Sequence, residues 1–74
     1  TSKELDFELE LACVISRDCR DLRADDTALD AVLGFTILND WSARDLQRAE
    51  VTVGLGPSKG KDFATSIGPH LIPT

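Results

Sequence analysis

Hydrophobic and polar residues alternate with a period of two over residues 5–16. This period predicts a β-strand, because successive side chains of a strand point to opposite faces. One face is apolar and is predicted to be core; it carries Phe7, Leu9, Leu11, Cys13 and Ile15. The opposite face begins acidic, with Asp6, Glu8 and Glu10, and ends apolar, which a simple solvent-facing strand would not require.

The next segment, residues 17–26, is rich in charged residues and predicts a solvated connection. Asp26 or Thr27 can cap a short helix after it. Gly34 is predicted to end this helix. The apolar stripe of the helix is formed by Leu29, Val32 and Leu33.

The following apolar residues, 35–38, predict a short buried strand that ends in a polar corner. The corner is the string Asn39-Asp40-Trp41-Ser42-Ala43-Arg44-Asp45-Leu46-Gln47. Ser42 with Asp45 three residues later forms a capping-box pattern, so a helix is predicted from Ala43. This density of polar groups is typical of a functional site, although a well-capped surface helix produces the same string.

Glycine and proline then dominate residues 51–63, which predicts an irregular loop that presents Lys61, and with it Lys59. The loop does not have the spacing of a phosphate-binding P-loop, and Asp62 stands where that motif needs Ser or Thr. Residues 64–73 resemble a strand that is broken by Gly68-Pro69.

The composition limits the function classes. The chain has 74 residues with 42% apolar residues, which predicts at most one domain and argues against disorder. Its net charge of −5 lies in residues 1–30, which hold nine acidic and four basic residues. Such a balance argues against nucleic-acid or anionic-membrane surfaces and is compatible with cation binding. No apolar run is long enough for a membrane helix.

The two cysteines, Cys13 and Cys19, lack metal-site or CxxC spacing. A disulfide between them stays open, but two reduced thiols in a cytoplasmic protein are favoured, with Cys13 buried on the apolar face. Because the chain starts at Thr1 without Met and stops just after an apolar stretch, we expect it to be part of a longer protein.

Two carboxylates on one strand face, Glu8 and Glu10, repel each other unless a cation or a basic group lies between them. Asp40 ends an apolar strand and is a candidate third ligand of a hard divalent cation. The alternative is a solvated strand face without a bound ion.

One helical turn separates Arg44 from Gln47, so both side chains lie on one face of the predicted helix. A forked cation and an amide are suited to orienting the carboxylate or carbonyl of a small acid. An ordinary surface pair is the alternative. His70, the single histidine, is assigned no role.

Together these residues resemble the fumarylacetoacetate hydrolase family over nearly the whole chain. The resemblance rests on three strings, Asp6-Phe7-Glu8-Leu9-Glu10, the corner of residues 39–47, and Gly60-Lys61-Asp62-Phe63-Ala64-Thr65. It implies an α+β fold, a mixed β-sandwich roll of the fumarylacetoacetase C-terminal type, of which residues 1–74 would be an incomplete central part of one catalytic domain with strands and two short helices.

The resemblance also implies a function and a site. Members cleave carbon-carbon bonds of dicarbonyl acids of the fumarylacetoacetate or acylpyruvate type, use a divalent cation (Mg²⁺ first, Mn²⁺ or Ca²⁺ otherwise), and are usually homodimers. The metal ligands would be Glu8, Glu10 and Asp40; the substrate-binding residues would be Arg44, Gln47 and, as a weaker transfer, Thr65. The catalytic residue would be Lys61, acting on a small oxo-acid.

The same residues are compatible with other reactions. Isomerases, decarboxylases and hydratases of oxo-acids from aromatic ring cleavage share the metal triad, and a degenerate domain without catalysis is a further alternative. In the hydrolases, the resemblance implies a water-activating His-Glu pair outside the matched strings. We therefore expect residues 1–74 to be inactive on their own.

Overall fold

The computed structural model describes residues 1–54 and 56–74, so the predicted irregular loop is described except at Leu55. The α+β class is confirmed, since strands are combined with two short helices. Neither described helix has the length or the apolar character that a membrane span requires. The elements in chain order are β1 (Leu5–Asp6), β2 (Leu9–Ile15), the 3₁₀ helix η1 (Asp26–Ala31), β3 (Val32–Asp40), β4 (Ser42–Ala43), α1 (Arg44–Val51), β5 (Thr65–Ile67) and β6 (Ile72–Pro73).

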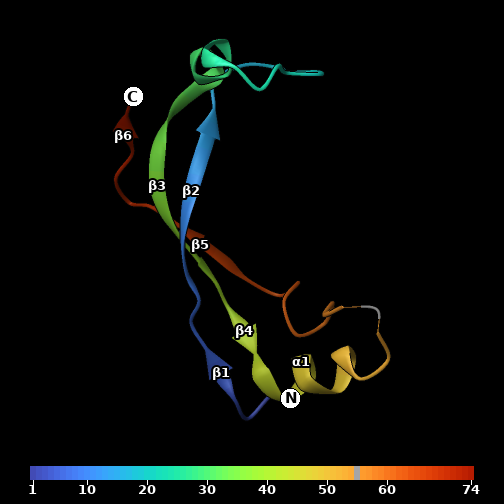
Figure 1. The fold of residues 1–74 in the computed structure, drawn as a ribbon. Coiled ribbons are helices and arrows are strands. Elements are labelled where there is room, and N and C mark those ends of the chain that lie inside the picture. The colour runs from blue at the N-terminus through green and yellow to red at the C-terminus, as the bar shows by residue number, and fades with distance from the viewer. Residues whose placement is uncertain (55) are drawn as a thin grey trace.

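The long antiparallel pair of β2 and β3 forms the central part of the molecule (Figure 1). On the other edge of β3, β5 pairs with its end and β6 with its beginning. The predicted break at Gly68-Pro69 is confirmed, since it separates these two short strands. A second, two-stranded sheet pairs β1 with β4, next to α1.

The third strand is longer than predicted. It starts at Val32, and Gly34 lies inside it instead of ending the preceding helix. The reason is tertiary: β6 pairs with β3 so closely that a Cβ at residue 34 would collide with the carbonyl oxygen of Ile72. Gly34 is therefore needed for a close approach of two backbones within the sheet. The helix before it ends at Ala31 as a 3₁₀ turn capped by Asp25, whose carboxylate accepts a hydrogen bond from the amide of Thr27.

The predicted strand over residues 5–16 is interrupted at Phe7 and Glu8, between β1 and β2. The backbone stays close to β3 across this break, because the Asp40 amide donates to the Glu8 carbonyl oxygen at 3.0 Å. The first strand is thereby split between two small sheets, and the acidic residues lie at the point where the two sheets meet.

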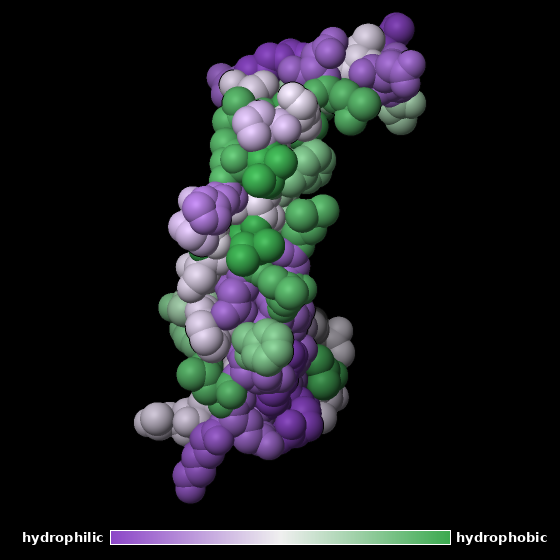
Figure 2. Space-filling model, turned by 90° about the vertical axis from the view of Figure 1, so that its left-hand side faces the viewer, coloured by the Kyte–Doolittle hydropathy of each residue, from purple (hydrophilic) through white to green (hydrophobic). Residues whose placement is uncertain are grey.

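The prediction that the apolar face of this strand is core is wrong for the described chain. Leu9 and Leu11 are 69% and 74% exposed, and Phe7, Cys13 and Ile15 are exposed as well. No second layer of the described residues packs on this face, and Figure 2 shows hydrophobic residues along the middle of the molecule. The radius of gyration, 16.0 Å, exceeds the roughly 11 Å of a compact chain of this length, which fits a single-layered sheet.

The cysteines are both free thiols, as favoured from the sequence, but Cys13 is exposed and not buried. It lies opposite Phe35 on the uncovered face of the hairpin. Its predicted burial failed for the same reason as that of its neighbours.

Candidate active site

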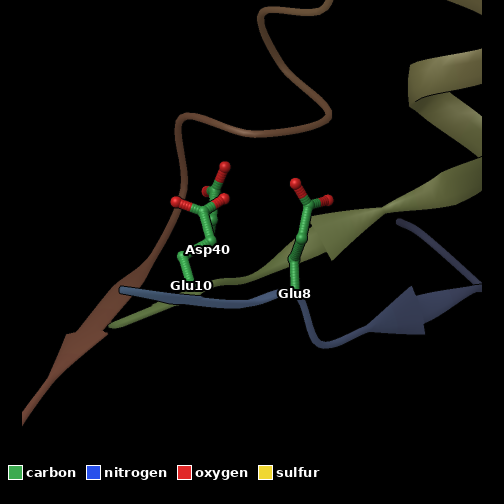
Figure 3. Close-up of side chains that lie close together, drawn as sticks. All are labelled: Glu8, Glu10 and Asp40. Atoms are coloured by element: carbon green, nitrogen blue, oxygen red, sulfur yellow. The ribbon is translucent and has the colours of Figure 1, made fainter. Parts of the chain in front are cut away.

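Three carboxylates meet where β2 begins and β3 ends. Antiparallel register places Glu10 opposite Leu38, and Asp40 lies two residues further along the same face of β3. Glu8, Glu10 and Asp40 each offer an oxygen within 4.8 Å of the others. Figure 3 shows the three side chains rising from the same side of the ribbon. The predicted grouping of these residues therefore exists in the structure.

This donor set fits a hard divalent cation. Carboxylate oxygens are the ligands that Mg²⁺ and Ca²⁺ prefer, and oxygens on opposite sides of one ion lie about 4 Å apart for Mg²⁺ and about 5 Å apart for Ca²⁺. Oxygens within 4.8 Å of one another need only small side-chain rotations to share an ion. Three negative charges held this closely also favour a cation electrostatically.

The ammonium group of Lys61 lies beside this cluster. Its Nζ donates to Glu8 Oε2 at 2.5 Å and to Ser42 Oγ at 2.7 Å, and lies 3.7 Å from Asp40 Oδ2. The Lys61 side chain is only 17% exposed. Its hydrogen bond, followed by that of Arg44, holds the pKa of Glu8 below its usual value in spite of the partial desolvation of that carboxylate. Glu8 is therefore ionised and ready to bind a cation at neutral pH.

The guanidinium of Arg44 spans the acidic strand and its own helix. Nε donates to Asp6 at 3.0 Å, and Nη1 donates to Glu8 at 3.1 Å and to Gln47 Oε1 at 2.9 Å. The hydrogen bond that Arg44 donates to the Asp6 carboxylate is the main cause that raises the pKa of Arg44. Arg44 and Gln47, which are one helical turn apart, are thus joined by a direct hydrogen bond. The same guanidinium nitrogen also binds the carboxylate of Glu8.

The predicted capping box at the start of α1 is wrong. The N-cap is Ala43, without a side-chain cap. Ser42, which is fully buried, donates from Oγ to the Asp40 carbonyl oxygen at 2.9 Å and accepts from Lys61. Asp45 accepts from the Ser2 hydroxyl and the Lys3 amide instead. Tertiary partners have displaced the local cap in both cases.

The other candidate residues lie around the same end of the sheet. Thr65 is exposed and pairs directly with Asp40 across β3 and β5. Trp41 donates from Nε1 to Ser66 Oγ at 2.9 Å. His70 contributes its carbonyl oxygen, which accepts a hydrogen bond from the buried hydroxyl of Thr36.

Three residues that contact the site were missed. Asp6 holds Arg44, Ser42 bridges Lys61 and the backbone, and Glu50 binds the loop that carries Lys61. The alternation of the first strand could have identified Asp6, because it lies two residues before Glu8 on the same predicted face. Ser42 has only the pattern of a helix cap, and no local pattern marks Glu50, so neither contact with the loop of residues 58–61 could be read from the sequence.

Comparison with known proteins identifies the class. The family described as fumarylacetoacetate (FAA) hydrolase C-terminal matches residues 1–74. The chain is 45% identical over 73 residues to the fumarylacetoacetase of Arabidopsis thaliana, covering 96% of this chain and 17% of that protein. It is 41% identical to an uncharacterized protein of Methanocaldococcus jannaschii, covering 96% and 29% respectively.

A solved structure agrees with the sequence comparison. The crystal structure of Cg1458 superposes with a TM-score of 0.81 at 39% identity, covering 97% of this chain and 27% of that one. The chain therefore belongs to the fumarylacetoacetate hydrolase family and has the fold of its C-terminal type. It spans less than a third of the length of each of these relatives.

Proposed function

We propose that the full-length protein carrying this sequence is a divalent-metal-dependent hydrolase that cleaves a carbon-carbon bond of a dicarbonyl acid of the fumarylacetoacetate or acylpyruvate type. The observation that carries this proposal is the convergence of Glu8, Glu10 and Asp40 within 4.8 Å, with a lysine and an arginine on the same cluster. Fumarylacetoacetases are among the relatives at 40–45% identity, which supports this substrate class.

In this proposal Glu8, Glu10 and Asp40 hold the cation, with Mg²⁺ favoured over Mn²⁺ and Ca²⁺. When bound, the cation supplies Lewis acidity that polarises the carbonyl oxygens of the substrate. Glu10 and Asp40 lie on the paired strands β2 and β3, Glu8 directly precedes β2, and Ser42 and Lys61 limit how far Glu8 can turn away. A preformed ligand set of this kind costs little reorganisation on binding.

Arg44 and Gln47 orient the substrate carboxylate. Their mutual hydrogen bond and the contact of Arg44 with Asp6 fix both side chains before substrate arrives. Lys61 offsets negative charge that develops on the substrate, or donates the proton that the leaving carbon needs. Thr65, opposite Asp40, contacts the far end of the substrate in this scheme.

Further parts of the proposal concern the whole protein. Residues 1–74 would be the central part of one catalytic domain, and the full-length protein would be a cytoplasmic homodimer. Light scattering after size exclusion tests the dimer. Product analysis with an acylpyruvate distinguishes hydrolysis from decarboxylation or isomerisation, for which the same cluster would serve.

The metal site is tested by calorimetric titration of the full-length protein with Mn²⁺ and Mg²⁺. Glu8→Gln and Asp40→Asn should each weaken binding by about 10-fold or more, since each removes one charged ligand. Asp62→Asn, which alters an exposed acid paired with Lys59, is the matched control and should bind as the parent does. Parental affinity in both ligand variants would contradict the assignment.

A further inference from the structure

The carboxylate of Glu50, near the end of α1, binds three successive backbone amides of the loop. Oε2 accepts from Ser58 at 3.0 Å and from Lys59 at 2.8 Å, and Oε1 accepts from Gly60 at 2.7 Å. These bonds, that of Gly60 first, lower the pKa of Glu50, so the carboxylate is charged and its bonds to the amides are strong. The next residue in the chain is Lys61.

A second set of contacts presses the same turn against the helix. The Gly60 carbonyl accepts from the Ala43 amide at 2.8 Å, and Gly60 is buried. A Cβ at this position would lie 2.9 Å from the backbone nitrogen of Gln47, so only glycine allows this approach. The turn is also closed internally, because the amides of Lys61 and Asp62 both donate to the Ser58 carbonyl.

These contacts have one shared consequence. The side chain of Lys61 must cross from the loop to the carboxylates on β2 and β3, and 53 residues separate it in sequence from Glu8. Its backbone is fixed mainly by the bonds to Glu50 and Ala43. In Figure 1 the loop after α1 returns alongside the helix before it runs into β5. The loop contains three glycines, so without that attachment its backbone could follow many other paths.

We infer that Glu50 is a positioning residue for Lys61: it binds the turn of residues 58–60 to α1 and thereby fixes the ammonium group beside Glu8 and Asp40. The expected kinetic consequence rests on the proposed function. The attachment of the turn to α1 is independent of that function. Helix α1 then has two tasks, since Arg44, Gln47 and Glu50 follow one another at intervals of three residues. One helix orients the substrate groups and sets the position of the lysine.

The kinetic test uses Glu50→Gln in the full-length protein. The substitution keeps the shape but replaces one acceptor oxygen by an NH2 donor, so at least one of the three amides loses its acceptor and faces another donor instead. We expect kcat to fall about 10-fold while KM changes little, because small misplacements of a catalytic group are costly. Glu50→Asp, which retains both oxygens, should recover part of the loss. Lys59→Ala, in the same turn but with an exposed side chain, should leave kcat unchanged.

A double-mutant cycle separates positioning from a general structural role. In a Lys61→Ala background, Glu50→Gln should change kcat by less than about 2-fold, because the group that it positions is gone. An equal loss in both backgrounds would overturn the inference, as would a parental kcat in Glu50→Gln.

Amide hydrogen exchange and acylation of Lys61, followed by mass spectrometry, test the attachment without turnover. In Glu50→Gln the amides of residues 58–60 should exchange hydrogen faster and Lys61 should be acylated faster. In Lys59→Ala both rates should stay as in the parent. Unchanged exchange and reactivity would overturn the inference. A parent enzyme without turnover would contradict the proposed function alone, since these two readouts would still decide the role of Glu50. Should Glu50→Gln fold poorly, Glu50→Asp gives the same readouts.

Discussion

The two faces of the β2–β3 pair are built in different ways. On one face, Glu10 and Asp40 lie close to Glu8, and Lys61 contacts both Glu8 and Asp40. On the other, Leu11 lies opposite Ile37, and these are 74% and 55% exposed. Among the described residues, no buried side-chain polar atom lacks a hydrogen-bond partner, while large apolar side chains lie uncovered.

The difference shows that the geometry of the site and the stability of the sheet have separate origins. Hydrogen bonds and ion pairs are directional and short, so a few neighbouring segments suffice to place the charged groups. Apolar burial stabilises in proportion to the area removed from water. Within the described residues, that area is small on the face of Leu11. The charged groups are therefore placed by contacts among these residues, whereas apolar burial on the face of Leu11 contributes little to the stability of the sheet.

The largest expected effect concerns the charged face. Lys61→Ala in the full-length protein should lower kcat by roughly 10²–10³-fold, the range for loss of a positioned proton donor or charge-stabilising group. Lys61→Arg keeps the charge but changes the reach, and should recover only part of the rate. Steady-state kinetics on an acylpyruvate measure both. A kcat within 3-fold of the parent in Lys61→Ala would remove the lysine from the chemistry.

The apolar face gives the next largest effect. Leu11→Asp should lower the free energy of unfolding of the full-length protein by about 3 kcal/mol, because contiguous exposed apolar surface of this kind is normally covered in a stable protein. Denaturant unfolding measures the change. Val53→Asp, at an equally exposed position just after α1, is the control and should change stability by less than about 0.5 kcal/mol. Equal effects of the two substitutions would mean that water covers this face.

The sequence predicted the strands and the carboxylate group because both depend on local rules. Alternation placed Glu8 and Glu10 on one face, and an apolar strand ending in Asp40 suggested the third ligand. Their proximity also depends on the antiparallel pairing of β2 with β3, a non-local contact that the sequence pattern did not specify. The class of the fold followed from the resemblance, and the comparison confirmed it.

The failed predictions at the helix ends involve contacts with segments that are distant in sequence. Ser42 has the pattern of a cap, but Lys61 and the Asp40 carbonyl bind its hydroxyl instead. Gly34 has the pattern of a helix stop, but the close pairing of β6 requires it within a strand. Glu50 had no pattern at all, since its partners are eight to ten residues away in a loop. Local propensity is a weak guide wherever such contacts compete with it.

A smaller effect is expected at Thr36, a buried polar residue of β3. Thr36 is 7% exposed and its hydroxyl donates to the His70 carbonyl at 2.6 Å. Thr36→Val keeps the shape and leaves that carbonyl without this donor, so the free energy of unfolding should fall by about 1 kcal/mol. Thr36→Ser, which keeps the hydroxyl, measures the separate cost of losing the methyl group. A Thr36→Val protein as stable as the parent would show that water replaces the hydroxyl at no cost.

The smallest expected effect is a pH dependence at the edge of the charged face. The Ser2 hydroxyl and then the Lys3 amide lower the pKa of Asp45 from 3.8 to about 2. Because the carboxylate is favoured in the folded state, its contribution to stability is present above pH 4 and is lost as the pH falls toward 2. Asp45 is only partly buried, so solvent screening keeps the contribution small. Unfolding curves of the parent and of Asp45→Asn should therefore differ slightly at pH 6 and converge near pH 2. A constant difference over this range would show that Asp45 stabilises the chain by contacts that do not depend on its charge.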